Sequence, residues 1–157
     1  MRMRYISILL LVVLTGFAIL ATFPHIPGTV IKVHAGGGGC SVASLHGKYA
    51  YHRTGVNNVV GGPIAEIGVS TYGGDGTRGP IRNTRSTNGD IRPWTDFPAP
   101  NGTYTVAPDC TGSLFDTDGT LSNNIIVVDG GKRFLVLSEA PDTITLEEGV
   151  RLEEEKD

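Results

Sequence analysis

The sequence predicts an all-β protein: a single antiparallel β-barrel of eight or nine strands behind an apolar amino-terminal segment. Two observations lead to this fold class. Residues 36–157 contain 20 Gly and 7 Pro, about 22% of that stretch, which is typical of many tight turns and too high for a helical bundle. Between these turn residues lie short segments rich in β-branched and aromatic side chains, with no helical period among them.

The amino terminus has the pattern of an export signal. Arg2 and Arg4 precede an uncharged, almost continuously apolar stretch at 6–23, and Val33 and Ala35 suit the −3 and −1 positions of a cleavage site. We therefore expect residues 1–35 to form a signal peptide. A retained membrane anchor is the alternative, because 18 residues are near the lower limit for a spanning helix. Both interpretations predict an exported protein that is extracellular, periplasmic or at the cell surface.

The two cysteines, Cys40 and Cys110, both follow the export signal. In an oxidising compartment such a pair predicts a disulfide. Two cysteines are too few for a structural zinc site, and His46 and His52 show no ligand spacing with them. We therefore interpret residues 36–44 as a spacer and disulfide-bearing lead-in, and the sequence predicts neither a metal nor a cofactor.

From residue 45 onward, strand-like segments alternate with turn signals such as those at 88–90 and 129–131. The segments recur about every ten to twelve residues, a spacing typical of sandwiches and barrels. The expected strands are 45–53, 63–72, 77–87, 91–97, 103–107, 112–116, 124–128, 133–138 and 143–152. The barrel domain is thus predicted to span 45–152, and the acidic end at 153–157 to fray into solvent.

Alternation of side chains predicts the faces of some strands. In 63–72, the more apolar of the two faces is predicted to be the core face. Its residues are Ala65, Ile67, Val69 and Thr71. The continuous apolar runs at 125–128 and 134–137 predict strands covered on both sides. In contrast, three arginines interrupt 77–87, which predicts an edge or solvent-facing strand.

Four segments carry a resemblance to a known family. They are Cys-Ser at 40–41 followed by SLHGKYA at 44–50, GPIA at 62–65, YGGDGT at 72–77, and GTYTVAPDCTG at 102–112. Over residues 40–138 the chain resembles small exported bacterial proteins with an allene-oxide-cyclase-like barrel domain. The resemblance implies an eight-stranded antiparallel barrel of lipocalin-like layout, distantly similar to cyclases and cycloaddition-promoting barrels that bind apolar ligands. No residue here matches a cyclase's catalytic position, so none is carried over.

Glu66 is the most interesting carboxylate, because it is the only charge in an otherwise apolar strand. Inside a barrel it would suit proton transfer or the anchoring of a ligand. The plainer interpretation, which we prefer, is that its face meets solvent, because Gly68 and Ser70 share that face. Glu66 is thus a weak catalytic candidate and one possible ligand contact.

Aromatic side chains supply the other candidates for a ligand site. Tyr49 and Tyr51 share a face, where packing is the expected role and ligand contact the alternative. Trp94 fits either a lid over the barrel mouth or a plug at the end of a strand. The full set of ligand-binding candidates is Tyr49, Tyr51, Glu66, Trp94 and Tyr104.

Two further polar features have plain interpretations. His52 has neither a nucleophile nor an acid beside it in sequence, so we expect a surface residue. The stretch 116–119 resembles the start of a calcium loop, but Val127 occupies the position where an EF-hand has its bidentate Glu. We expect a turn there.

The function hypotheses follow from these features. Residues 36–157 carry ten Lys/Arg against sixteen Asp/Glu, which argues against binding to nucleic acid. The leading hypothesis is a non-catalytic barrel that binds a small apolar or amphipathic ligand. The alternatives are an isomerase or cyclase using Glu66 or a tyrosine, and a structural or adhesive envelope protein that assembles through exposed edges and apolar outer faces. Membrane contact is expected only through an uncleaved amino-terminal segment, and an oligomer is compatible with the sequence.

Overall fold

Nine β-strands and two short 3-10 helices form the described part of the chain. The structure is a computed structural model and describes residues 39–59 and 61–153. The strands are β1 (His46–Asn57), β2 (Gly62–Gly73), β3 (Arg78–Thr87), β4 (Asp90–Phe97), β5 (Thr103–Val106), β6 (Thr111–Phe115), β7 (Leu121–Val128), β8 (Arg133–Ser138) and β9 (Thr143–Arg151). The helices are η1 (Val42–Ser44) and η2 (Asp129–Gly131). The predicted segment 1–35 lies outside the described residues, as does the end of the tail at 154–157.

All nine strands pair in one antiparallel sheet, in the order β4-β3-β2-β1-β9-β8-β7-β6-β5. Strands consecutive in sequence are neighbours, except β4 and β5, which are the two edges, and β1 also pairs with β9, for example Tyr51 with Gly149. Tight turns make this meander possible, as between β3 and β4, where Asn88 and Gly89 adopt positive φ. The prediction of an all-β antiparallel protein is confirmed. In the described residues, no helix is long and apolar enough to cross a membrane.

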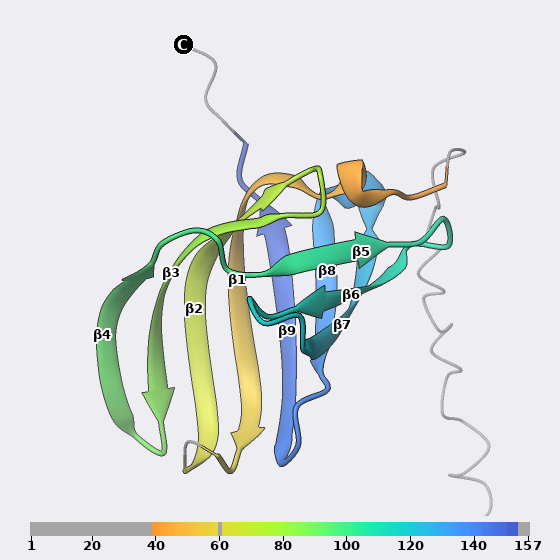
Figure 1. Ribbon diagram of the computed structural model, residues 1–157. Helices are drawn as coiled ribbons and strands as arrows, with labels where there is room; N and C mark the ends of the chain where they lie inside the picture. The colour runs from red at the N-terminus through yellow and green to blue at the C-terminus, as the bar shows by residue number, and fades with distance from the viewer. Residues whose placement is uncertain (1–38, 60, 154–157) are drawn as a thin grey trace, which may run out of the picture. The chain divides into compact units, whose positions relative to one another are not determined.

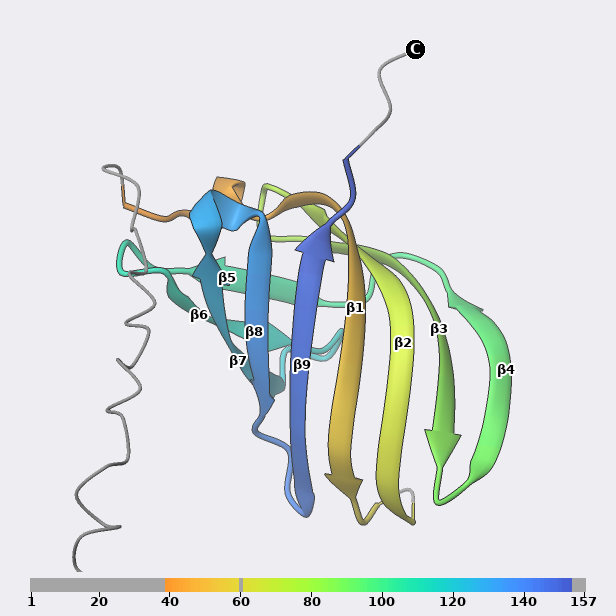
Figure 2. The same cartoon turned by 180° about the vertical axis from the view of Figure 1, so that it is seen from behind.

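The sheet curls into a half-barrel (Figures 1 and 2). Figure 1 shows β5 and β6 crossing in front of the concave face, and Figure 2 looks onto the convex face of β9, β1 and β2. The edge strands β4 and β5 form no ladder with each other within the described residues. The chain at the start of β3 meets β5 instead, through the bridge between Thr77 and Thr103 and a bond from the Tyr104 N–H to the Gly76 carbonyl (2.8 Å).

Four aromatic rings hold the curl together at the end of the sheet near η1. Tyr72 of β2 lies at the centre, with ring centroids 5.5 Å from Tyr49 of β1, 5.5 Å from Phe134 of β8 and 5.3 Å from Tyr104 of β5. All four side chains are almost fully buried. Edge-to-face contacts of this kind add about 1 kcal/mol each to the burial of apolar area. This aromatic layer therefore fixes β5 over the concave face of the sheet.

Two glycines give the rings of the concave face the room they need. A Cβ at Gly149 would lie 2.2 Å from the Phe134 ring, which occupies the opposite position on β8. A Cβ at Gly68 would lie 2.8 Å from Cε1 of Tyr51. Large side chains thus lie over positions where the neighbouring strand has no side chain.

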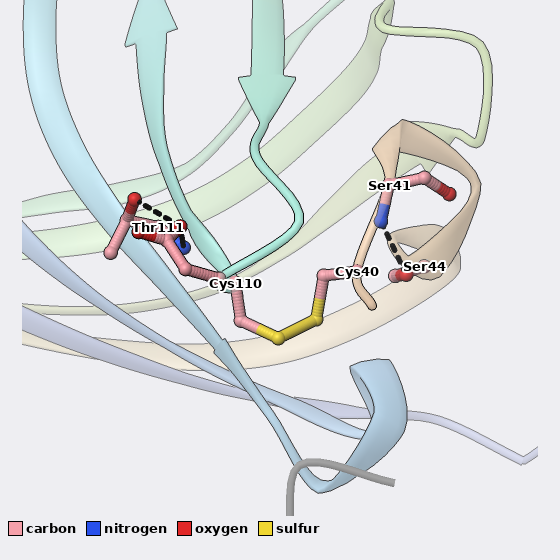
Figure 3. The surroundings of a disulfide bond; sticks show 6 residues. Cys40, Ser41, Ser44, Cys110 and Thr111 are labelled. Atoms are coloured by element: carbon pink, nitrogen blue, oxygen red, sulfur yellow. Dashed lines mark hydrogen bonds between the residues drawn. A yellow bond between two sulfur atoms is a disulfide. The ribbon is translucent and has the colours of Figure 1, made fainter. Parts of the chain in front are cut away.

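The predicted disulfide between Cys40 and Cys110 is present (Figure 3). Its Cα atoms are 4.9 Å apart, and the Cys40 N–H donates to the Pro108 carbonyl at 3.1 Å. The bond ties the segment before η1 to the turn between β5 and β6. Because it closes a loop of 70 residues, it restricts the unfolded chain strongly.

The faces of β2 are the reverse of the prediction. Glu66 and Ile64 are buried on the concave face, with exposed fractions of 4% and 6%, whereas Ile67 is 54% exposed on the convex face. The prediction that Glu66 meets solvent was wrong. Large side chains of the neighbouring strands, such as the Tyr51 ring, occupy the concave side, so small residues such as Gly68 suit β2 there, while Ile67 is left outside.

The apolar runs in β7 and β8 are also covered on one side only. Ile125 and Val136 are buried on the concave face, while Ile126, Leu135 and Leu137 are all more than 40% exposed. The prediction of cover on both sides was wrong, because no strand or helix of residues 39–59 and 61–153 lies over this part of the convex face (Figure 2).

The arginine-rich strand β3 is not the edge of the sheet. It pairs with both β2 and β4, and β4 is the edge strand. The alternation of β3 sends Arg82 to the convex face, where it is well exposed, and Arg85 to the concave face. The prediction of a solvent-facing strand therefore holds for one of its two faces.

Candidate functional site

Five charged residues form one row across the concave face. Cross-strand pairing places Glu147 of β9 beside Arg53 of β1, Arg53 beside Glu66 of β2, Glu66 beside Arg85 of β3, and Arg85 beside Arg92 of β4. Their positions share the parity of Tyr51 and Gly68, which face the concave side. We call these five residues the charged row. Its charges alternate in sign over the first four positions and end on two neighbouring arginines.

The best-paired part of the row is the arginine between two glutamates. Nη2 and Nε of Arg53 lie 2.7 and 2.8 Å from Oε2 of Glu147, and Nη2 lies 3.9 Å from Oε1 of Glu66. Both carboxylates are more than 90% buried. Burial acts to lower the pKa of Arg53, but Glu147 and then Glu66 outweigh it and raise the pKa above its ordinary value. Arg53 therefore stays charged.

The Glu66 carboxylate is also held by two neutral groups. The Tyr51 hydroxyl donates to its Oε1 at 2.8 Å, and Nδ2 of Asn83 lies 3.0 Å from both that oxygen and the Tyr51 hydroxyl oxygen. Burial, and then the negative charge of Glu66, raise the pKa of Tyr51 well above its ordinary value. Tyr51 is thus a neutral hydrogen-bond donor at any physiological pH.

The arginine end of the row is poorly compensated. Nη2 of Arg92 donates to Oδ1 of Asn83 at 2.5 Å, and its guanidinium lies 5.3 Å from the centroid of the Phe97 ring. The Nε atoms of Arg85 and Arg92 are buried and have no hydrogen-bond partner among the described residues. Three arginines face two glutamates along the row, so the charged row carries one surplus positive charge.

The structure brings together only part of the predicted ligand site. Tyr51 and Glu66 are in direct contact within the charged row. Tyr49 and Tyr104 lie in the aromatic layer, where their hydroxyls donate to backbone carbonyls, from Tyr49 to Gly131 (2.6 Å) and from Tyr104 to Leu45 (2.7 Å). These two tyrosines pack, which is the role preferred from the sequence for Tyr49.

Trp94 stands apart from the other candidates. Its side chain is 51% exposed, and its ring contacts the guanidinium of Arg82, a residue of the convex face, at 5.7 Å. It therefore neither touches the charged row nor plugs the aromatic layer.

Most of the residues that complete the site were not predicted from the sequence to belong to it. Arg53 had a usable signal, because it follows Tyr51 by two residues and so shares its face. The other missed residues had none, because their place depends on register between distant strands. They are Asn83, Arg85, Arg92 and Glu147.

The two features given plain interpretations behave as expected. His52 is exposed on the convex face of β1. The stretch at 116–119 is a turn, in which the Gly119 N–H donates to the Asp116 carbonyl at 3.0 Å. Among residues 39–59 and 61–153 there is no cluster of three or more His, Cys, Asp or Glu side chains that could hold a metal ion.

Two open grooves lie elsewhere on the surface. One of about 530 Å³ borders β2, β3 and β4, with Val69, Ile81 and Phe97 in its lining. The other, of about 610 Å³, runs over β5, β6 and β7, beside Val106 and Ile126. Neither is lined by a residue of the charged row, so each is a separate surface feature.

The chain matches no protein-family model, no curated protein and no solved structure. Its resemblance to the allene-oxide-cyclase-like barrels therefore stays a prediction from sequence segments.

Proposed function

We propose that this protein is an exported, non-catalytic binding protein that holds a small amphipathic ligand against the concave face of its sheet. The observation that carries the proposal is the poorly compensated arginine end of the charged row. A ligand with a polar and an apolar part would place its polar part at Arg85 and Arg92 and its apolar part against the half-buried ring of Phe97 beside Arg92. The disulfide supports export, because such bonds persist in oxidising compartments.

The free-energy cost of burying unpaired arginine atoms favours a binding role for the row over a purely structural one. Burying an arginine Nε without a hydrogen-bond partner costs about 1–3 kcal/mol per group, and the row contains two such atoms. A core that served stability alone would be better filled by apolar side chains. Departures from good packing of this kind concentrate at functional sites. A ligand that supplies the missing acceptors would remove the penalty.

We do not extend the proposal to catalysis. Oε1 of Glu66 already accepts bonds from Tyr51 and Asn83 and lies near Arg53. With that oxygen already engaged by neighbouring side chains, it is not free to take a proton from a substrate, which disfavours the isomerase or cyclase alternative.

The proposal is tested by titrating the mature protein with the neutral fluorophore N-phenyl-1-naphthylamine. We expect saturable enhancement of fluorescence and amide chemical-shift changes around Tyr51 and Asn83. Two residues of β2 supply matched variants: Ile64→Ser on the concave face should weaken binding at least tenfold, and Ile67→Ser on the convex face should not. Absence of saturable binding, or shifts confined to the groove beside Val69, would overturn the proposal.

A second candidate function, assembly of an envelope structure, is favoured by the convex face. Apolar side chains at least 40% exposed lie along adjacent strands there, and they include Val56, Ile67, Ile126, Leu135, Leu137, Ile144, Leu146 and Val150. Contiguous exposed apolar surface of this kind marks interaction sites. Sedimentation of the wild type beside Leu146→Arg tests it: self-association abolished by the variant supports assembly, and a wild-type monomer at high concentration contradicts it.

A further inference from the structure

We infer that Arg85 and Arg92 form a docking site for one oxyanion, a carboxylate, phosphate or sulfate group carried by the ligand. The inference deepens the proposed function and rests on it for the statement that the anion belongs to a larger ligand. Three observations support it. The two arginines are paired across neighbouring strands, their Nε atoms lack hydrogen-bond partners, and the charged row carries a surplus positive charge.

The register places two like charges side by side. Arg85 of β3 is the direct antiparallel partner of Arg92 of β4. Like charges at directly opposed positions destabilise a sheet, so the pair needs a compensating anion. Glu66 is the next residue along the row, but it forms no ion pair with Arg85 and is already engaged by Tyr51, Asn83 and Arg53. Within the described residues, no acidic side chain neutralises this end of the row.

The Nε donors of both arginines are vacant, and the guanidinium of Arg92 is also held in place. Nε of each is buried and lacks an acceptor in the described part of the chain. Arg92 is oriented on two sides, by its bond to Asn83 and by the ring of Phe97. A guanidinium offers its N–H groups as a planar fork that matches the two oxygens of a carboxylate or phosphate. Pre-ordering of the fork lowers the entropy lost when an oxyanion binds.

The distribution of charge restricts the expected anion binding to this part of the protein. Residues 36–157 carry an excess of acidic residues, so the protein as a whole does not attract anions. The surplus positive charge lies on the concave face, where partial burial strengthens its attraction for an anion compared with bulk water. We therefore expect recognition of an oxyanion at this point and not a general affinity for polyanions.

The first test follows the arginine Nε–Hε resonances by NMR while inorganic phosphate is added at constant ionic strength. We expect saturable shifts at Arg85 and Arg92 and none at Arg82, an exposed arginine on the opposite face of the same strand. Arg85→Gln and Arg92→Gln should each abolish the saturable response, Arg85→Lys should weaken it, and Arg82→Gln should leave it unchanged. Absence of a shift, or equal drift of all arginine signals, would overturn the inference.

The second test separates this inference from the proposed function by comparing 1-naphthoate with neutral 1-naphthalenemethanol. We expect the anion to bind at least tenfold more tightly, with the difference lost in folded Arg85→Gln protein, as judged by circular dichroism. Equal binding of both compounds would overturn the oxyanion site and keep the binding function. Saturable phosphate shifts without binding of either aromatic compound would keep the oxyanion site and overturn the amphipathic ligand.

Discussion

The guanidinium of Arg53 contacts the carboxylate of Glu147 at 2.7 Å, although the two residues are 94 positions apart in the sequence. The contact joins β1 to β9, the pairing that unites the early and late strands in one sheet. It also anchors the charged row, because Arg53 lies between its two glutamates. The same pair therefore serves the fold and the candidate site.

Glu147→Gln should destabilise the protein by about 3 kcal/mol, because it leaves Arg53 with only the more distant Glu66 carboxylate. Urea unfolding measures the effect. The control is Glu148→Gln on the neighbouring residue, whose partner Arg133 is exposed, and it should change stability by less than about 1 kcal/mol. Equal losses in the two variants would show that the concave pair is screened by solvent.

Gly149→Ala should destabilise the fold by about 2 kcal/mol, because the new methyl group would overlap the Phe134 ring. Phe134→Leu removes the ring atoms that meet this methyl group. In the double variant the losses should therefore be less than additive, with a coupling on the order of 1 kcal/mol in thermal or urea unfolding. Simple additivity would mean that the sheet relaxes around the new side chain.

Removing the disulfide by Cys40→Ser with Cys110→Ser should lower the free energy of unfolding by up to about 4 kcal/mol. The main cause is the freedom regained by the unfolded chain, so the folded circular dichroism spectrum should be retained. Adding reductant should reproduce the loss in the wild type and have no effect on the double variant. A reductant-sensitive double variant would contradict this explanation.

Stability should fall as the pH rises above about 10. Burial raises the pKa of both Tyr51 and Tyr72 above the ordinary value of 10.0, so the folded state keeps these protons after the unfolded state has lost them. Their contribution is complete below pH 10 and decreases above it by about 1.4 kcal/mol per pH unit for each tyrosine. Unfolding by urea between pH 9 and pH 11 measures the slope.

The matched variant for this prediction is Tyr72→Phe, which removes one of the tyrosines whose pKa is raised by burial. Its stability should decline less steeply with pH than that of the wild type. An unchanged slope would show that other groups govern the alkaline transition. Absorbance at 295 nm should rise together with unfolding, since these tyrosines ionise only when they become exposed.

Local sequence pattern was sufficient for the strands and their turns. β8 matches its predicted range, and β2 differs from the prediction by one residue at each end. β1 continues to Asn57, four residues past its predicted end, because pairing with both β2 and β9 supports residues that have little strand preference of their own. The disulfide was likewise predictable, since two cysteines allow a single pairing.

The faces of the strands were not predictable from alternation alone. Alternation shows which side chains share a face, as Tyr49, Tyr51 and Arg53 do, but not which face becomes the interior. In β2 and β9 the more apolar positions lie outside, where Ile67 and Leu146 are 54% and 64% exposed. The pattern of hydrophobic residues within one strand therefore predicted the wrong face to be buried.

The candidate site was likewise predictable from the sequence only in part. Tyr51 and Glu66 could be named from sequence, whereas Arg85, Arg92 and Glu147 enter the site only through the register of five strands. Register between strands distant in sequence depends on how their side chains pack across the whole curled sheet, and no local window contains that information. Composition and turn chemistry thus determined the kind of fold, and the tertiary structure decided which charges meet on its concave face.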